Sequence, residues 1–166
     1  VYGQQRNPTR VVFPREDNLF APSGDAAGSD VYPCVFTTYR LTEHHTAGGM
    51  SRWLPYLSEL QPEFFVEIGE ALAQEKGIKT GSMVRVWSKR GSVKAKAVVT
   101  KRIQPLTCDG KTVHVIGIPL HWGFMGAAKK GFGPNSLTPY VGDANAETPE
   151  FKAFLVDIEP IAGPTA

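Results

Sequence analysis

Cysteine is scarce in this sequence: Cys34 and Cys108 are its only two cysteines, and they stand far apart. A zinc knuckle needs paired thiolates and an iron–sulfur cluster needs about four cysteines, so neither can be assembled from this pair. The ordinary interpretation is that both are small buried hydrophobic side chains. The sequence therefore predicts no cysteine-based metal centre in this chain.

An excess of charge is also missing, because 18 basic and 16 acidic residues leave a formal net charge of +2. A net charge of this size is too small to indicate a nucleic-acid-binding surface or a membrane-surface patch. No segment approaches the roughly 18 consecutive apolar residues of a membrane span, and the N-terminus lacks the pattern of a signal peptide. We expect no nucleic-acid partner and no direct membrane span, and any anionic ligand must be held by local groups.

What the sequence does contain favours one mainly β domain. It has 166 residues, 42% of them hydrophobic, with 17 glycines and 13 prolines, which is typical of short strands joined by shaped loops. Residues 1–30 are rich in proline and glycine without apolar periodicity, and predict a linker or arm before a folded domain at 31–166. The chain begins at Val1, which predicts processing or a longer parent and leaves its cellular location open.

Local patterns predict six strands and one short helix. The β-branched and aromatic runs lie at 31–39, 62–68, 83–87, 92–101, 112–118 and 151–158. Between 92 and 101 small apolar residues alternate with Lys94 and Lys96, which indicates a sheet with one solvated face. Helix formers at 70–76 end at Gly77. Without regular strand–helix alternation, these elements predict a closed barrel with inserted short helices.

The loop after the first strand, residues 37–52, reads TTYRLTEHHTAGGMSR. It offers hydroxyl groups, backbone N–H groups at close approach through Gly48 and Gly49, and the cations Arg40 and Arg52. These are the groups that bind a pyrophosphate. The alternative is a plain polar loop in which an arginine pairs with Glu43.

A second candidate region lies in the irregular stretch 119–150 and at the start of the last strand, where a loop this long is usually functional or disordered. It contains His121 and Trp122, followed by Asn135 and Lys152. Asn135 can donate to and accept from a heterocycle, and Lys152 can supply a point charge. Taken singly, a turn asparagine and a surface lysine are the ordinary alternatives.

Other chemistries find less support. A metal site built from His44, His45, His114 and His121 is disfavoured because adjacent histidines diverge and no H-x-x-x-H helix is present. No G-x-S-x-G elbow, P-loop or G-x-G-x-x-G fingerprint occurs. From the residues alone, the best hypothesis is a protein whose loops bind an anionic ligand.

Four segments together carry a family resemblance. They are TTYRLTEHHTAGGMSR at 37–52, QPEFFVEI at 61–68, IPLHWGF at 118–124 and NSLTPYVGDANAETPEFKAFLVDIEP at 135–160. In this order they resemble the C-terminal domain of the molybdopterin-dependent oxidoreductases, most closely that of formate dehydrogenase major subunits. Related nitrate reductases favour T-G-R where this chain has Thr38-Tyr39-Arg40, which supports the formate branch.

The resemblance implies a double-psi β-barrel, like that of aspartate decarboxylase, that covers one face of a bis-molybdopterin guanine dinucleotide. Matched by position, the cofactor-binding residues are Thr38, Tyr39, Arg40, Glu43, His44, His45, Thr46, Ala47, His121, Trp122, Asn135 and Lys152. A dinucleotide with two phosphates agrees with cations and hydroxyl groups gathered on loops of a nearly neutral domain.

The resemblance also implies partners that this chain lacks. In the family, formate is oxidised to carbon dioxide at molybdenum or tungsten, and the metal's cysteine or selenocysteine ligand lies in an earlier domain. We therefore expect the N-terminal catalytic and iron–sulfur domains of a parent subunit, electron-transfer subunits beside it, and no redox activity of this chain alone. The alternatives are another parent, of the nitrate reductase, polysulfide or formylmethanofuran dehydrogenase type, or a non-redox barrel that binds proteins.

Overall fold

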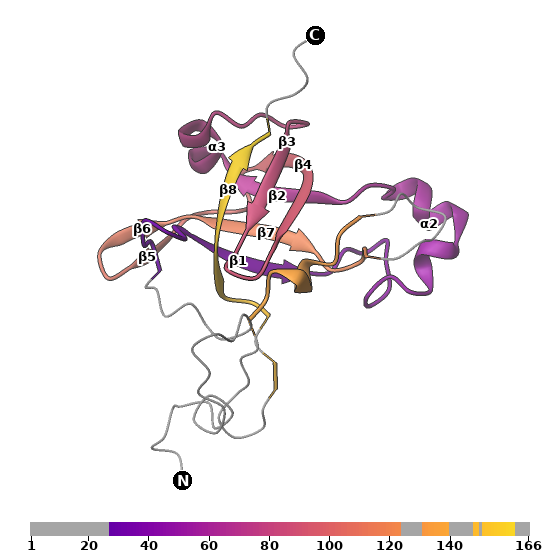
Figure 1. Ribbon diagram of the computed structural model, residues 1–166. Helices are drawn as coiled ribbons and strands as arrows, with labels where there is room; N and C mark the ends of the chain where they lie inside the picture. The colour runs from indigo at the N-terminus through magenta and orange to yellow at the C-terminus, as the bar shows by residue number, and fades with distance from the viewer. Residues whose placement is uncertain (1–26, 124–130, 140–147, 150, 162–166) are drawn as a thin grey trace.

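Six strands close into a barrel, in the order β1-β7-β2-β4-β3-β8 around it (Figure 1). The structure is a computed structural model that describes residues 27–123, 131–139, 148–149 and 151–161. The barrel strands are β1 (Cys34–Tyr39), β2 (Phe65–Gly69), β3 (Met83–Trp87), β4 (Ser92–Thr100), β7 (Val115–Pro119) and β8 (Phe154–Pro160). The mainly β, closed-barrel class expected from the sequence is confirmed. Most of the expected arm at 1–30 lies outside the described residues.

Parallel and antiparallel neighbours are mixed around the barrel. β1 pairs with β7 and β2 pairs with β4 in parallel, while the other four neighbours are antiparallel. Parallel neighbours need long crossover connections, so residues far apart in the sequence meet at the same barrel edge. This order is consistent with the double-psi connectivity, which stays a prediction.

Short helices interrupt the strands as expected, but not all of them were foreseen. α3 (Glu70–Lys76) has the expected bounds and ends at Gly77, whose φ of 65° suits a residue without a Cβ. α2 (Pro55–Leu60) and the 3₁₀ turn η1 (Ser51–Trp53) fall where the sequence predicted only a polar loop. None of the described helices is long and apolar enough to cross a membrane.

The expected strand at 112–118 is wrong as a single element. β6 (Lys111–Val113) pairs with β5 (Leu106–Cys108) in a separate two-stranded sheet, and β7 pairs with β1 and β2 in the barrel. His114 lies between them, and its carbonyl accepts a hydrogen bond of 2.9 Å from the Val35 N–H. The chain changes its pairing partner at this residue, which hydrophobic alternation alone does not reveal. The first and last strands also begin later than predicted, at Cys34 and Phe154.

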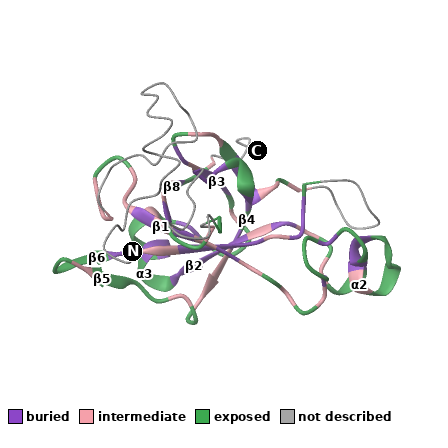
Figure 2. Cartoon of the chain, turned by 90° about the horizontal axis from the view of Figure 1, so that it is seen from below, coloured by how far each residue is buried: buried purple, intermediate pink, exposed green. Residues whose placement is uncertain are grey.

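The buried core residues lie mostly on the barrel strands, where buried positions are coloured purple (Figure 2). On β4 the expected alternation is confirmed, because Val93, Ala95 and Ala97 are buried while Lys94 and Lys96 are exposed. Phe36 on β1 is fully buried, and its ring centroid lies 4.6 Å from that of Phe154 on β8. Further fully buried apolar residues are Val66, Ile68, Val84, Val86, Ile116, Ile118, Val156 and Ile158.

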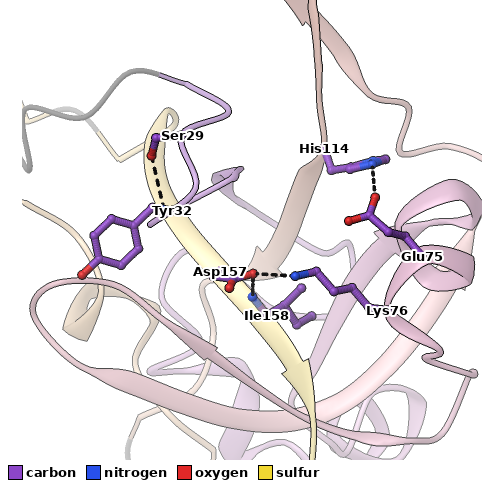
Figure 3. Close-up of polar contacts among 7 residues, drawn as sticks. All are labelled: Ser29, Tyr32, Glu75, Lys76, His114, Asp157 and Ile158. Carbon is purple, nitrogen blue, oxygen red and sulfur yellow. Dashed lines mark hydrogen bonds and ion pairs between the residues drawn. The ribbon is translucent and has the colours of Figure 1, made fainter.

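Polar contacts tie α3 to the strands beside it (Figure 3). Lys76 at the end of α3 pairs with Asp157 of β8 at 3.2 Å, and Glu75 lies 3.1 Å from His114. Asp157 also accepts from the N–H of Ile158 at 2.7 Å. His114 therefore contacts α3, and Asp157 of β8 does the same. His114 has no part in the loop after β1.

The two cysteines are both free. Cys34 is buried as expected, and burial, more than the neighbouring Asp157 charge, raises the pKa of its thiol to about 12. Cys108, on β5, is only partly buried, so the prediction of a buried hydrophobic residue holds for Cys34 alone.

Candidate functional site

The two candidate regions begin side by side at one barrel edge. β1 and β7 run parallel with Tyr39 opposite Pro119, so both chains leave the sheet at the same level. The Leu120 N–H donates to the Tyr39 carbonyl at 3.0 Å, and the Leu41 N–H donates to Nε2 of His121 at 2.7 Å. The segment after β7 is therefore attached to the loop that follows β1.

A buried layer of aromatic and imidazole rings lies beneath this loop. His44, His121 and Trp122 are all buried, and the His44 ring centroid lies 5.5 Å from that of His121 and 5.3 Å from that of Trp122. The family resemblance predicted all three residues as cofactor contacts. Their burial favours a supporting role for the rings, and direct contact with a ligand stays a prediction.

Hydrogen bonds hold His44 in one orientation. Its Nε2 donates to the Gln61 carbonyl at 2.9 Å, because a carbonyl can only accept. Nδ1 of His44 lies 3.3 Å from Oγ of Ser51, and this hydroxyl accepts from the His45 N–H at 2.8 Å. His44 thereby links the loop to the segment that precedes β2.

Gly48 allows the loop to close against His121. Its φ is 82°, and a Cβ at this position would lie 2.5 Å from the His121 carbonyl oxygen. Neither feature is compatible with a side chain. Gly49 differs, because a Cβ there would meet no atom within 4 Å. Of the two glycines singled out in the sequence, only Gly48 is required by the packing.

His121 is electrically neutral in the folded domain. Burial lowers the pKa of its imidazole to about 4, and the neighbouring His44 and Arg40 act in the same direction, against opposite effects of the Thr46 backbone and of Glu43. Within the described ranges, no three or more histidine, cysteine or acidic side chains are grouped so that they could hold a metal ion.

Above the buried layer lies an exposed one. Arg40, His45, Thr46 and Ala47 are exposed, whereas Glu43 is partly buried. Thr46 has a φ of 46°, which reverses the backbone direction between the exposed residues and Gly48. The loop therefore presents one cation, one imidazole, the hydroxyls of Thr42 and Thr46 and several backbone groups to its surroundings. Hydrogen bonds of the buried residues hold it from below.

Arg52 does not belong to the exposed layer. Its side chain is fully buried, and its guanidinium carbon lies 5.8 Å from the Trp122 ring centroid. Burial lowers its pKa. The sequence paired Arg52 with Arg40 as phosphate ligands, but this position favours a role in holding the loop against Trp122.

Tyr39 points to the other face of β1 from Thr38. Its hydroxyl donates to the Glu67 carboxylate, which also accepts from Nε of Arg102 at 3.1 Å. A Cβ on Gly117 would lie 2.8 Å from the Tyr39 ring, so the ring occupies the space that this glycine leaves. Burial, together with the bond to Glu67, raises the pKa of Tyr39. The side chain thus has a structural partner, and its contact with a ligand stays a prediction.

Lys152 joins the loop from the far end of the sequence. Its Nζ donates to the carbonyl of Thr38 and to the Thr38 hydroxyl, the latter at 3.2 Å. The Thr38 hydroxyl donates to the Phe151 carbonyl at 3.1 Å. The ammonium group is therefore held at the end of β1, two residues before Arg40, and two of the positions predicted from the sequence meet.

Asn135 lies in a different place, at the turn between β3 and β4. Its side chain is exposed on the 3₁₀ turn η2 (Pro134–Ser136). The carbonyl of Leu137, which follows this turn, accepts from Oγ of Ser88 at 2.9 Å and from Nε of Arg90 at 2.7 Å. Sequence reasoning missed Ser88, Arg90 and the Gln61 carbonyl as supports, since they are distant in sequence and unremarkable in type.

Replacing His121 by glutamine is expected to flatten the acid dependence of the domain's stability. The unfolded imidazole titrates near 6.5 and the folded one near 4, so between these values the unfolded chain binds a proton that the folded chain does not. The contribution to the free energy of unfolding is complete above about pH 6.5 and falls, by at most about 1.4 kcal/mol per pH unit, as the pH drops towards 4. Glutamine keeps an acceptor for the Leu41 N–H but does not titrate.

Urea unfolding of both proteins from about pH 7 to about pH 4 measures this difference. Because carboxylates titrate in the same range, the comparison is between the two slopes. Parallel curves would show that His121 does not carry the effect.

Comparisons with known proteins show the family of this chain. Residues 34–155 match the family described as "Molydopterin dinucleotide binding domain". The formate dehydrogenase-O major subunit of Escherichia coli (strain K12) is 55% identical over 144 residues, which cover 86% of this chain and 14% of that protein. The formate dehydrogenase subunit alpha of Megalodesulfovibrio gigas is 43% identical over 152 residues, or 92% of this chain and 14% of that protein.

A solved structure supports the fold alone. Acetylene hydratase from Pelobacter acetylenicus superimposes with a TM-score of 0.55 at 14% identity, over 77% of this chain and 18% of that chain. The chain thus spans a small part of the proteins that it matches. The family match covers β1, the loop after it, and every further barrel strand up to the start of β8. The chain belongs to the molydopterin dinucleotide binding domain family.

Proposed function

We propose that this domain clasps a molybdopterin guanine dinucleotide within a formate dehydrogenase major subunit that oxidises formate to carbon dioxide. The relatives in Escherichia coli and Megalodesulfovibrio gigas, both formate dehydrogenases by name, support this assignment. Because the match covers only 14% of either relative, the catalytic and iron–sulfur domains and the electron-transfer subunits are proposed as partners outside this chain.

The observation that carries the proposal is the hydrogen bonding of Lys152 to Thr38, where the loop after β1 begins. Lys152 is bound at Thr38, and Arg40 is exposed two residues further on. Two cations held at one barrel edge, beside exposed backbone at Thr46 and Ala47, suit the phosphate groups of a dinucleotide. Among the buried rings below, the His121 imidazole is neutral near pH 7, because its pKa is lowered to about 4.

Roles follow from the chemistry of each group. Arg40 would bind phosphate oxygens through its planar guanidinium, and Lys152 would add a point charge. Asn135 would bind a heterocycle edge from the β3–β4 side. When bound, the cofactor supplies the molybdenum or tungsten at which formate is oxidised. This chain's residues bind and orient that cofactor, and without the earlier domains we expect it to be inactive.

Replacing Arg40 or Lys152 by alanine in the complete subunit is expected to weaken cofactor retention by about tenfold to a hundredfold each. The estimate follows from the roughly 1.5–3 kcal/mol contributed by a hydrogen bond to a charged group. Lys94→Ala is the matched control, because Lys94 is an exposed lysine on β4. The measurement is the rate at which metal and guanine nucleotide leave the purified subunit during dialysis.

Equal retention in all three variants would contradict the proposal and favour a barrel that binds proteins rather than a cofactor. An unchanged urea midpoint in the Arg40→Ala variant separates a binding defect from a folding defect.

A further inference from the structure

Several large apolar side chains lie between the end of the loop after β1 and the start of β2. We call residues 50–60, which contain η1 and α2, the apolar lobe. Figures 1 and 2 both place α2 to one side of the barrel. The exposed large side chains of the lobe are Met50 (65% exposed), Trp53 (61%), Leu54 (52%), Tyr56 (83%) and Leu60 (68%).

The lobe is firmly attached on its inner side. Arg52 is buried against Trp122, and its carbonyl accepts from the Ser58 hydroxyl at 3.0 Å. Gln61, just after the lobe, binds His44 through its carbonyl. Arg52 and Ser58 are therefore buried while most apolar side chains of the lobe are exposed, the reverse of an ordinary amphipathic turn.

The outer surface of the lobe is poor in charge. Arg52 and Glu59 are its only charged residues, and of these only Glu59 is exposed. The five exposed apolar side chains stand close together in the sequence and include a tryptophan and a tyrosine. Apolar and aromatic side chains with little charge are typical of the centre of a protein interface.

We propose that the apolar lobe is the docking surface for another domain of the same formate dehydrogenase major subunit. This inference rests on the proposed function. Two observations select that occupant: the matched relatives extend far beyond the 14% that this chain covers, and the lobe continues directly from the loop that bears Arg40. A domain that encloses the other side of the cofactor must approach this same edge, where covering the lobe would also bury its apolar area.

The test is the labelling rate of single cysteines in the complete subunit. Tyr56→Cys probes the lobe, and Leu106→Cys on β5, also an exposed position, is the matched control. Both side chains are exposed in this domain, so neither substitution removes core packing. A maleimide is added to the native subunit, and modification of each peptide is followed by mass spectrometry, with urea-denatured protein as the reference.

We expect the cysteine at position 56 to react at least about tenfold more slowly than the one at position 106 in the native subunit, and at the same rate after denaturation. Equal native rates would overturn the proposal. Protection that disappears on dilution would also overturn it, since it would identify a second copy as the occupant. This readout is independent of cofactor retention in the Arg40 and Lys152 variants, so either proposal can fail while the other stands.

Discussion

Replacing Phe36 by alanine is expected to lower the free energy of unfolding by about 3–5 kcal/mol, the largest effect on stability foreseen for this chain. Phe36 is fully buried in the barrel, and its ring lies against Phe154 at a centroid distance of 4.6 Å. Alanine would remove the ring and leave a cavity between β1 and β8. Since domains of this size are stable by roughly 5–15 kcal/mol, the variant is expected to lie close to its unfolding threshold.

Urea unfolding followed by circular dichroism measures the effect, with Phe132→Ala as control. Phe132 is a phenylalanine that is nearly half exposed, so its replacement is expected to cost less than about 1 kcal/mol. A loss below about 1 kcal/mol for Phe36→Ala would mean that the barrel interior is not packed as described.

Gly48→Ala is expected to destabilise the domain by about 2 kcal/mol or more and to weaken cofactor retention in the complete subunit. A side chain in the left-handed region costs about 1–2 kcal/mol, and forcing a methyl group against packed atoms adds a similar amount. Here the methyl carbon would stand 2.5 Å from the His121 carbonyl oxygen, so the loop must move away from its support. The exposed groups from Arg40 to Ala47 would then lose their common orientation.

Gly49→Ala is the matched control, because a Cβ there meets no atom within 4 Å and its φ is not positive. It is expected to change the urea midpoint and the cofactor retention little. If both glycine variants behave alike, the close approach of the loop to His121 is not what orders the binding surface.

Local sequence pattern accounts for much of the fold. Alternation on β4 and the helix formers of α3, ended by Gly77, depend on neighbouring residues and were predicted closely. The break at His114 was not, because it arises from the partners that β6 and β7 find elsewhere. α2 and η1 were missed for a related reason: they are short, and contacts such as Ser58 with Arg52 hold them.

The candidate site shows the same division. Residue type alone marked Arg40 and Lys152 as cations of interest, and the structure joins Lys152 to Thr38. Residue type did not distinguish His44, which is buried, from His45, which is exposed beside it. The two differ only in the direction that the loop backbone gives to each side chain.

The sequence by itself determined the strand-rich class, the position of the candidate loop and, through four ordered segments, the family. These properties depend on residues close in sequence or on their order along the chain. Only the tertiary structure decided that Lys152 stands beside the loop, that Arg52 is buried against Trp122, and that most apolar side chains of residues 50–60 are exposed. The reason is physical: parallel pairing of β1 with β7 brings distant segments together, and their packing determines which side chains are buried.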